Sequence, residues 1–239
     1  MQDRLELALT KFTQQNLTTT CAGRTDAGVH AVEQVIHFDT EIERTQSSWV
    51  RGLNSHLPSS IAVQWATTVR DDLEQEFHAR FSARARTYHY LIHNRAVRSP
   101  LWFGKAAWVF RPLDVDRMQA AAECLIGTHD FSAFRSIDCQ AKTPVKTMYQ
   151  VALHRQDDLI VVKLRANAFL HHMVRNIIGS LVYVGTGRNP IEWIAELLTH
   201  KNRHLAAPTF SPDGLYLTKI DYDPNWQLPM RQSLPFGVF

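Results

Sequence analysis

A short segment near the N-terminus places a guanidinium and a carboxylate between two glycines. Residues 21–31 read Cys-Ala-Gly-Arg-Thr-Asp-Ala-Gly-Val-His-Ala, so Arg24 and Asp26 lie between Gly23 and Gly28. The glycines permit backbone conformations that other residues disfavour, and they let a substrate approach closely. A neighbouring guanidinium favours the ionised form of a carboxylate and can orient it. Asp26 is therefore a candidate nucleophile or general base.

Aspartates also have an ordinary role in turns, and this alternative applies to the glycine loop itself. Gly and Asp are frequent in tight turns, where the carboxylate accepts a local Asx-type hydrogen bond. The pairs Asp71-Asp72 and Asp157-Asp158 could also supply two carboxylates for glycoside hydrolysis. Both pairs lie in segments that we expect to be turns, so solvated acids are the preferred interpretation.

Neither a metal site nor a disulfide framework is indicated by the sequence. The three cysteines, Cys21, Cys124 and Cys139, are odd in number and far apart, and they form no Cys-x-x-Cys pair. His171 and His172 are adjacent, but zinc needs further ligands, so an ordinary hydrogen-bonded pair is the preferred interpretation. We expect no metal and no cofactor.

Composition indicates a globular chain. The 239 residues are 45% hydrophobic, which is enough for one large domain or two small ones. No apolar run is long enough to cross a bilayer, and the first residues do not resemble a signal peptide. We therefore expect a cytoplasmic protein that has no membrane partner. The net charge of +3 is compatible with a nucleic-acid partner without arguing for one.

One stretch combines arginines with aromatic residues, as an RNA-binding groove would, because arginine contacts phosphates and aromatic rings contact bases. A solvated strand face with ordinary aromatic core positions explains the pattern equally well. The residues concerned are Arg80, Phe81, Arg84, Arg86, Tyr88, Tyr90, Arg95 and Arg98.

Hydrophobic periodicity predicts helices and strands that do not alternate regularly, so the expected fold class is α+β with largely antiparallel sheet. Helices are expected at about 2–15, 47–56, 114–127, 169–184 and 190–200. Strands are expected at about 17–21, 32–38, 61–65, 87–92, 106–110, 148–154, 159–165 and 215–220, with a hairpin turn at Asp157-Asp158.

Four segments, in order along the chain, resemble the motifs of one enzyme family. The segment 21–31 closely resembles the signature of the TruA family of tRNA pseudouridine synthases. Residues 77–90, which include Phe-His-Ala-Arg-Phe-Ser-Ala and Arg-Thr-Tyr-His-Tyr, resemble its second motif. Ala-Phe-Leu-His-His-Met-Val-Arg-Asn-Ile at 168–177 resembles the third motif, and Gly-Leu-Tyr-Leu at 214–217 resembles the fourth.

The resemblance implies a role for five residues. Asp26 matches the catalytic aspartate of the family, and Arg24 matches the arginine that pairs with it. Tyr88 matches the tyrosine that packs against the target base. Arg175 matches an arginine that lines the cleft, and Leu217 lies in the segment that closes the pocket through apolar contact.

The resemblance also implies the fold, the reaction and the partners. The fold would be two α/β halves around a central cleft, with an N-terminal half at 1–82, a C-terminal half at 83–222 and a tail at 223–239. The protein would be an isomerase that converts uridine to pseudouridine in the tRNA anticodon stem-loop, at positions 38 to 40, without cofactor or metal. It would act as a homodimer that shares one tRNA across two subunits.

The chain departs from the family pattern at its start. Family members usually begin with a strand that carries Tyr-Asp-Gly and Gly-Trp-Gln segments, and neither segment is found here. Loss of that strand would expose a sheet edge beside the loop that carries Asp26. A truncated, non-catalytic RNA-binding homologue is therefore the alternative to an active enzyme.

Overall fold

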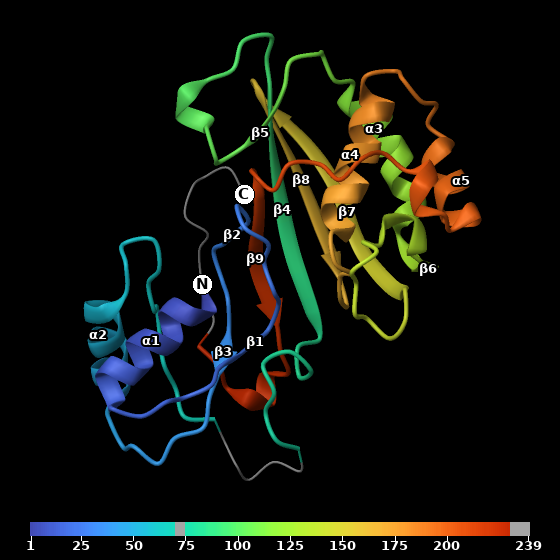
Figure 1. Cartoon of the computed structure of the whole chain (residues 1–239). Coiled ribbons are helices and arrows are strands. Elements are labelled where there is room, and N and C mark those ends of the chain that lie inside the picture. Colours follow the sequence, from blue (N-terminus) through green and yellow to red (C-terminus); the bar gives the residue numbers. More distant parts are fainter. Residues whose placement is uncertain (70–74, 230–239) are drawn as a thin grey trace. The chain divides into compact units, whose positions relative to one another are not determined.

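The computed structural model describes residues 1–69 and 75–229, and it divides the chain into two compact units, each built from separate segments (Figure 1). The smaller unit contains residues 1–24, 35–69, 75–83 and 222–229. The larger unit contains Thr25–Gln34 and Arg84–Asp221. The segment that carries Asp26 therefore belongs to the larger unit. The division into halves at 1–82 and 83–222 and a tail at 223–239 stays a prediction. The pair Asp71-Asp72 lies outside the described residues.

Two helices form the core of the smaller unit. Helix α1 spans Gln2–Thr13 and helix α2 spans Gln46–His56, which confirms both predicted helices. They pack through apolar side chains that recur at helical spacing. These are Leu5, Ala8, Leu9, Trp49 and Leu53. Strands β1 (Thr20–Cys21) and β3 (Ile36–His37) pair antiparallel, so the predicted strands at 17–21 and 32–38 are shorter than expected.

The predicted strand at 61–65 is wrong. Residues 61–65 belong to no strand of the described structure, and the Val63 backbone pairs with a side chain instead. Val63 N–H donates to Asn54 Oδ1 at 2.7 Å, and Asn54 Nδ2 donates to the Val63 carbonyl at 2.8 Å. Val63 also packs against the core between α1 and α2. An amide on helix α2 thus satisfies the backbone groups that a ladder would otherwise satisfy.

A mostly antiparallel sheet organises the larger unit, and it confirms the α+β class. Its order is β2-β9-β4-β8-β7-β6, with β5 also paired to β4. The pairs β2–β9 and β4–β5 are parallel, and the others are antiparallel. The strands are β2 (His30–Ala31), β4 (Ala85–Asn94), β5 (Ala107–Val109), β6 (Gly127–Asp130), β7 (Val145–Gln156), β8 (Leu159–Ala166) and β9 (Leu215–Asp221).

The turn between β7 and β8 confirms the predicted hairpin. Asp157 has φ 52°, a conformation that Asp tolerates in turns, and Asp158 forms an exposed ion pair with Arg95 at 3.2 Å. This pair of acids therefore has a local structural role.

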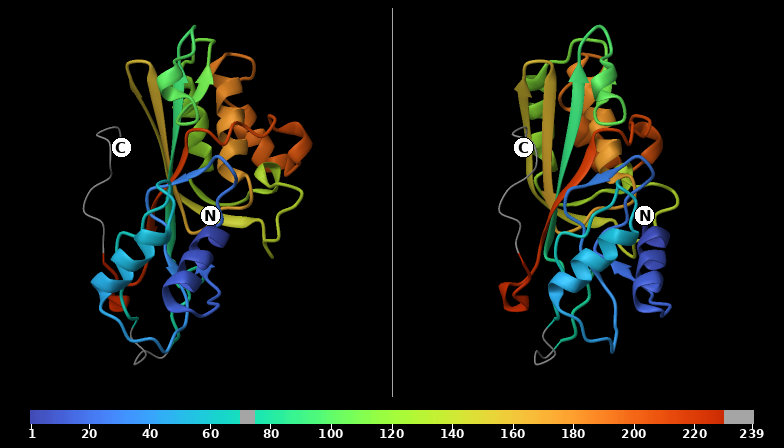
Figure 2. Two further views of the ribbon diagram at one scale, coloured as in Figure 1. Left: turned by 60° about the vertical axis from the view of Figure 1, so that its left-hand side comes forward. Right: turned by 90° about the vertical axis from the view of Figure 1, so that its left-hand side faces the viewer.

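Three helices gather on one face of this sheet (Figure 2). They are α3 (Val115–Ala122), α4 (Met173–Gly185) and α5 (Trp193–His200). Short 3-10 helices lie at Pro100–Trp102, Glu123–Leu125, Ser132–Phe134, Arg203–Leu205 and Pro224–Trp226. Asp114 caps α3 as predicted, because its carboxylate accepts the Arg117 N–H at 3.0 Å.

Helix α4 begins later than the sequence predicts. The expected start is near residue 169, but His172 has φ 61° and regular helix begins only at Met173. The residues before the helix thus form a separate bend. Once it begins, α4 is nearly completely buried, which fits its long apolar stripe.

Two further expectations concern the cysteines and the membrane. Cys21, Cys124 and Cys139 are all free thiols. Within residues 1–69 and 75–229, no helix combines the length and apolar character that a bilayer span requires.

The predicted tail is partly structured. Trp226 is buried, and its ring lies edge-on to Phe77, with 5.1 Å between the ring centroids. Residues 230–239 lie outside the described part of the chain.

Candidate active site

A tight turn presents Asp26. The Val29 N–H donates to the Asp26 carbonyl at 3.1 Å, and Gly28 has φ +84°, which favours glycine. A Cβ atom at Gly28 would lie 3.0 Å from Pro212 Cγ. The chain then enters β2, where Ala31 pairs with Leu217 of β9. The turn is therefore fixed by the strand that follows it and by the segment before β9.

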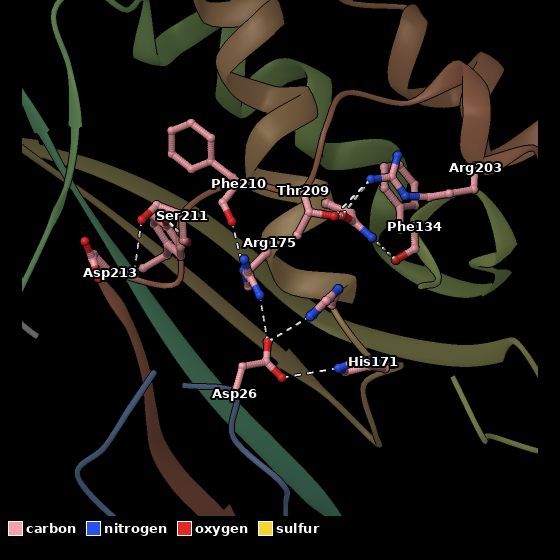
Figure 3. A network of polar contacts seen from close by, with 12 residues as sticks. Asp26, Phe134, His171, Arg175, Arg203, Thr209, Phe210, Ser211 and Asp213 are labelled. Carbon is pink, nitrogen blue, oxygen red and sulfur yellow. Dashed lines mark hydrogen bonds and ion pairs between the residues drawn. The ribbon is translucent and has the colours of Figure 1, made fainter. Parts of the chain in front are cut away.

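The carboxylate of Asp26 is held by three side chains from one short segment (Figure 3). Arg175 Nη1 donates to Oδ2 at 2.8 Å. His172 Nε2 lies 3.2 Å from Oδ2, and His171 Nε2 lies 3.3 Å from Oδ1. The Asp26 side chain nevertheless keeps 26% of its surface exposed. It is thus oriented by partners on both oxygens and still accessible to a substrate.

The bend before α4 directs both histidines to the same carboxylate. Successive side chains in an extended segment point to opposite sides, but the left-handed conformation of His172 changes this direction. The two rings lie with centroids 3.9 Å apart. Burial lowers the pKa of His172 and outweighs the Asp26 carboxylate, which raises it. The neutral imidazole is therefore the favoured form of His172.

Arg175 is also tied to a backbone segment on its other side. Residues 207–213 precede β9, and we call this segment the strap. Arg175 Nε donates to the Phe210 carbonyl at 2.8 Å, so the guanidinium bridges the strap and Asp26 (Figure 3). Tyr90 of β4 donates its hydroxyl to the Ser211 carbonyl at 2.6 Å. The strap is thereby attached to the sheet beside the residue that it helps to position.

A buried amide ties the strap to α4. Asn176 is fully buried, and its Nδ2 donates to the Phe134 carbonyl at 2.8 Å. Its Oδ1 accepts from Thr209 Oγ1 at 2.8 Å and from Arg203 Nη2 at 3.0 Å. Arg203 Nη2 also donates to Thr209 Oγ1 at 3.1 Å. Asn176 directly follows Arg175 in the sequence, and none of these four hydrogen bonds involves Asp26.

Tyr88 and Leu217 are register partners on β4 and β9, next to an irregularity in the ladder. Leu217 is fully buried, and Tyr88 is 9% exposed. The Tyr88 ring packs edge-on against Phe169, with 5.0 Å between the centroids. Val32 N–H, just beyond β2, donates to the Leu217 carbonyl at 2.8 Å. Backbone hydrogen bonds therefore join Leu217 to the segment that carries Asp26.

The structure thus brings Asp26 and Arg175 into direct contact and pairs Tyr88 with Leu217. Arg24 ends a segment of the smaller unit, and its pairing with Asp26 stays a prediction. The histidines at 171 and 172 and the strap are contributions that the sequence did not assign to the site. Their signal was the position of the two histidines three and four residues before Arg175.

The other members of the arginine-aromatic stretch are divided between core and surface. Tyr90 is fully buried, and Arg86 is buried and donates to the Asn167 carbonyl at 3.1 Å. Phe81 is 76% exposed, and Arg95 is paired with Asp158. The stretch therefore supplies core residues as well as exposed groups.

Metal-ligating atoms also meet at Asp26. The carboxylate and the ring nitrogens of His171 and His172 lie within 4.8 Å of one another, so these three residues could hold a cation.

Comparison with known proteins agrees with the sequence motifs. A family model described as tRNA pseudouridine synthase matches residues 1–82 and 121–223. The chain is 64% identical to tRNA pseudouridine synthase A of Herminiimonas arsenicoxydans over 236 aligned residues. The alignment covers 99% of this chain and 86% of that protein. It is also 64% identical, over 238 residues, to the protein of the same name from Janthinobacterium sp. (strain Marseille). That alignment covers 99% of this chain and 88% of the relative. The resemblance found in the motifs is confirmed, and the chain belongs to the tRNA pseudouridine synthase family, whose members are isomerases.

Proposed function

We propose that this protein converts uridine to pseudouridine in the anticodon stem-loop of tRNA, at positions 38 to 40, with Asp26 as the catalytic carboxylate. The observation that carries the proposal is the Asp26 carboxylate, oriented by Arg175 at 2.8 Å and still 26% exposed. This geometry occurs in a chain whose close relatives are named tRNA pseudouridine synthase A.

The reaction needs no cofactor, because it is an internal exchange of bonds. The glycosidic bond between N1 of uracil and C1′ of the ribose breaks, and a bond between C5 and C1′ forms. The proton on C5 is lost, and N1 gains one, so atoms and electrons balance. Asp26 begins the exchange by attacking the sugar or by removing a sugar proton, and an ionised, oriented carboxylate suits either route.

The other site residues hold the carboxylate and the base. Arg175 keeps Asp26 in one orientation, and we assign Arg24 as a second cation beside it. The target base must leave its stack, and an aromatic ring such as Tyr88 is suited to receive it. Leu217, which pairs with Tyr88 across two strands, lies in the segment that closes the pocket through apolar contact and retains the uracil while it turns.

Replacement of the carboxylate tests the proposal. Asp26→Asn keeps the size of the side chain but removes the nucleophile or base, so pseudouridine formation in an unmodified tRNA transcript should fall at least about 100-fold. Asp116→Asn, on an exposed position of α3, is the matched control and should retain full activity. Pseudouridine mapping gives the position, and a filter-binding assay gives the affinity for tRNA.

The same experiment addresses the alternative of a non-catalytic RNA-binding homologue. That alternative predicts that the unsubstituted protein binds tRNA and never modifies it. Full activity of Asp26→Asn would instead contradict the assignment of the carboxylate. We also propose a cytoplasmic homodimer that shares one tRNA across two subunits, which is the arrangement implied by the family. Light scattering in which only monomer is found, with and without tRNA, would contradict it.

A further inference from the structure

The Asp26 carboxylate and two of the groups that orient it, His171 and His172, also match the coordination chemistry of zinc. Zinc is commonly bound by imidazole nitrogens at about 2.0 Å and by carboxylate oxygens at about 2.0–2.2 Å in tetrahedral sites. Ligand atoms in such a tetrahedron lie roughly 3.3 Å apart. His171 Nε2 lies 3.3 Å from Asp26 Oδ1, and His172 Nε2 lies 3.2 Å from Asp26 Oδ2.

The direction of the two imidazoles is built into the backbone. Two adjacent histidines present their rings to one carboxylate because His172 adopts φ 61° directly before α4. The cluster is open to solvent, since the side chains of His171, His172 and Asp26 are 40%, 25% and 26% exposed. A hydrated cation can therefore reach the three ligands, and water can occupy a fourth position.

Arg175 limits how tightly such a cation binds. Its guanidinium donates to Asp26 Oδ2 at 2.8 Å and repels a positive ion. The guanidinium is anchored to the Phe210 carbonyl, so it stays near the cluster. A metal that binds the carboxylate and the two imidazoles therefore lies close to this cation, which weakens its binding.

We propose that Asp26, His171 and His172 form an inhibitory zinc site, in which Zn²⁺ binds the catalytic carboxylate and blocks the reaction. The inhibition rests on the proposed function, but zinc binding does not. Magnesium, which is present in tRNA assays, prefers six oxygen ligands and does not compete for a site with two imidazoles. The carboxylate is ligated only while zinc is bound, so a chelator restores activity.

Isothermal titration of the metal-free full-length protein with ZnCl₂ tests binding. One site per chain is expected for the unsubstituted protein. The double variant His171→Gln/His172→Gln should bind zinc at least tenfold more weakly, because Gln keeps polarity and bulk but is a poor zinc ligand. His200→Gln, at an exposed position in the last turn of α5, is the matched control and should bind as the unsubstituted protein does. Circular dichroism checks that each variant is folded.

Inhibition is measured separately, as the zinc concentration that halves the rate of each protein relative to its own zinc-free rate. That concentration should rise at least tenfold in the double variant and stay unchanged in His200→Gln, and EDTA should restore the rate. Equal zinc affinity in the double variant and the control would overturn the proposal, and so would zinc binding that leaves an active enzyme uninhibited. If the protein never forms pseudouridine, the proposed function fails, and the titration alone still decides whether the zinc site exists.

Discussion

The substitution Thr209→Val tests whether the strap positions the Asp26 carboxylate, which we propose to be catalytic. Valine keeps the shape of threonine and removes one hydroxyl, which donates to Asn176 Oδ1 at 2.8 Å and accepts from Arg203 Nη2 at 3.1 Å. Loss of these two bonds at an exposed position costs about 1–2 kcal/mol. The neighbouring Phe210 carbonyl accepts a hydrogen bond from Arg175, and Arg175 donates to Asp26. A less firmly held strap should therefore leave the ion pair between Arg175 and Asp26 less well fixed.

The expected result is a decrease in kcat of about 5–30-fold, since each ~1.4 kcal/mol corresponds to a factor of ten. KM should change less than twofold, because the Thr209 hydroxyl bonds to Asn176 and Arg203, which are not assigned to the base. The reaction releases the proton on C5, so tritium release from tRNA labelled at C5 of uridine measures the rate. Thr209→Ser, which restores the hydroxyl, should be nearly as active as the unsubstituted protein.

Thr199→Val is the matched control, since that hydroxyl bonds only within α5, to the Ala195 carbonyl at 3.0 Å. The reasoning is refuted if Thr209→Val lowers the melting temperature and leaves kcat unchanged, because the strap then contributes stability alone. It is also refuted if Thr209→Ser is as impaired as Thr209→Val.

Three further predictions concern pH, the turn and the core. Burial lowers the pKa of His89 from 6.5 to about 4, so His89 is neutral when folded, and the stability it allows is lost as pH falls from about 6.5 towards 4. This loss of stability is at most about 3 kcal/mol. Urea unfolding at pH 7 and pH 4.5 should show that the free energy of unfolding falls less in His89→Gln than in the unsubstituted protein. An equal fall in both proteins would contradict the assignment. Gly28→Ala forces a side chain into φ +84° and against Pro212, so tritium release should slow about tenfold, and an unchanged rate would show that the turn tolerates the change. Leu217→Ala should lower the free energy of unfolding by about 2–5 kcal/mol, measured in urea, and a loss below about 1 kcal/mol would mean that the neighbours collapse into the cavity.

Local sequence patterns predicted most elements of the fold, but not their ends. Helices α1 and α2 and the hairpin at Asp157 each follow from a pattern of residues close together in the sequence. The structure confirms all three elements. The strand predicted at 61–65 failed because period-two alternation does not reveal whether a partner strand exists, and here Asn54 takes that place. The start of α4 was missed because the left-handed conformation of His172 has no signal in residue type.

The candidate site was predictable in its residue types and not in its contacts. Asp26 and Arg175 were identified by motif resemblance, yet they are 149 residues apart, and no local pattern pairs them. The involvement of His171 and His172 depends on a bend, and that of Phe210 depends on a backbone carbonyl, which every residue possesses. Tertiary geometry therefore supplied the partners that sequence spacing could not.

The separation of Asp26 from its partners also sets when, during its own synthesis, the protein can first act. The segment Thr25–Gln34 is made well before its pairing strand β9, which spans Leu215–Asp221. Arg175 is made 149 residues after Asp26, which takes roughly 7–30 s at about 5–20 residues per second. A nascent chain therefore carries Asp26 during that time without the groups that orient it. Premature release anywhere before His171 yields a chain that lacks all three side chains around Asp26.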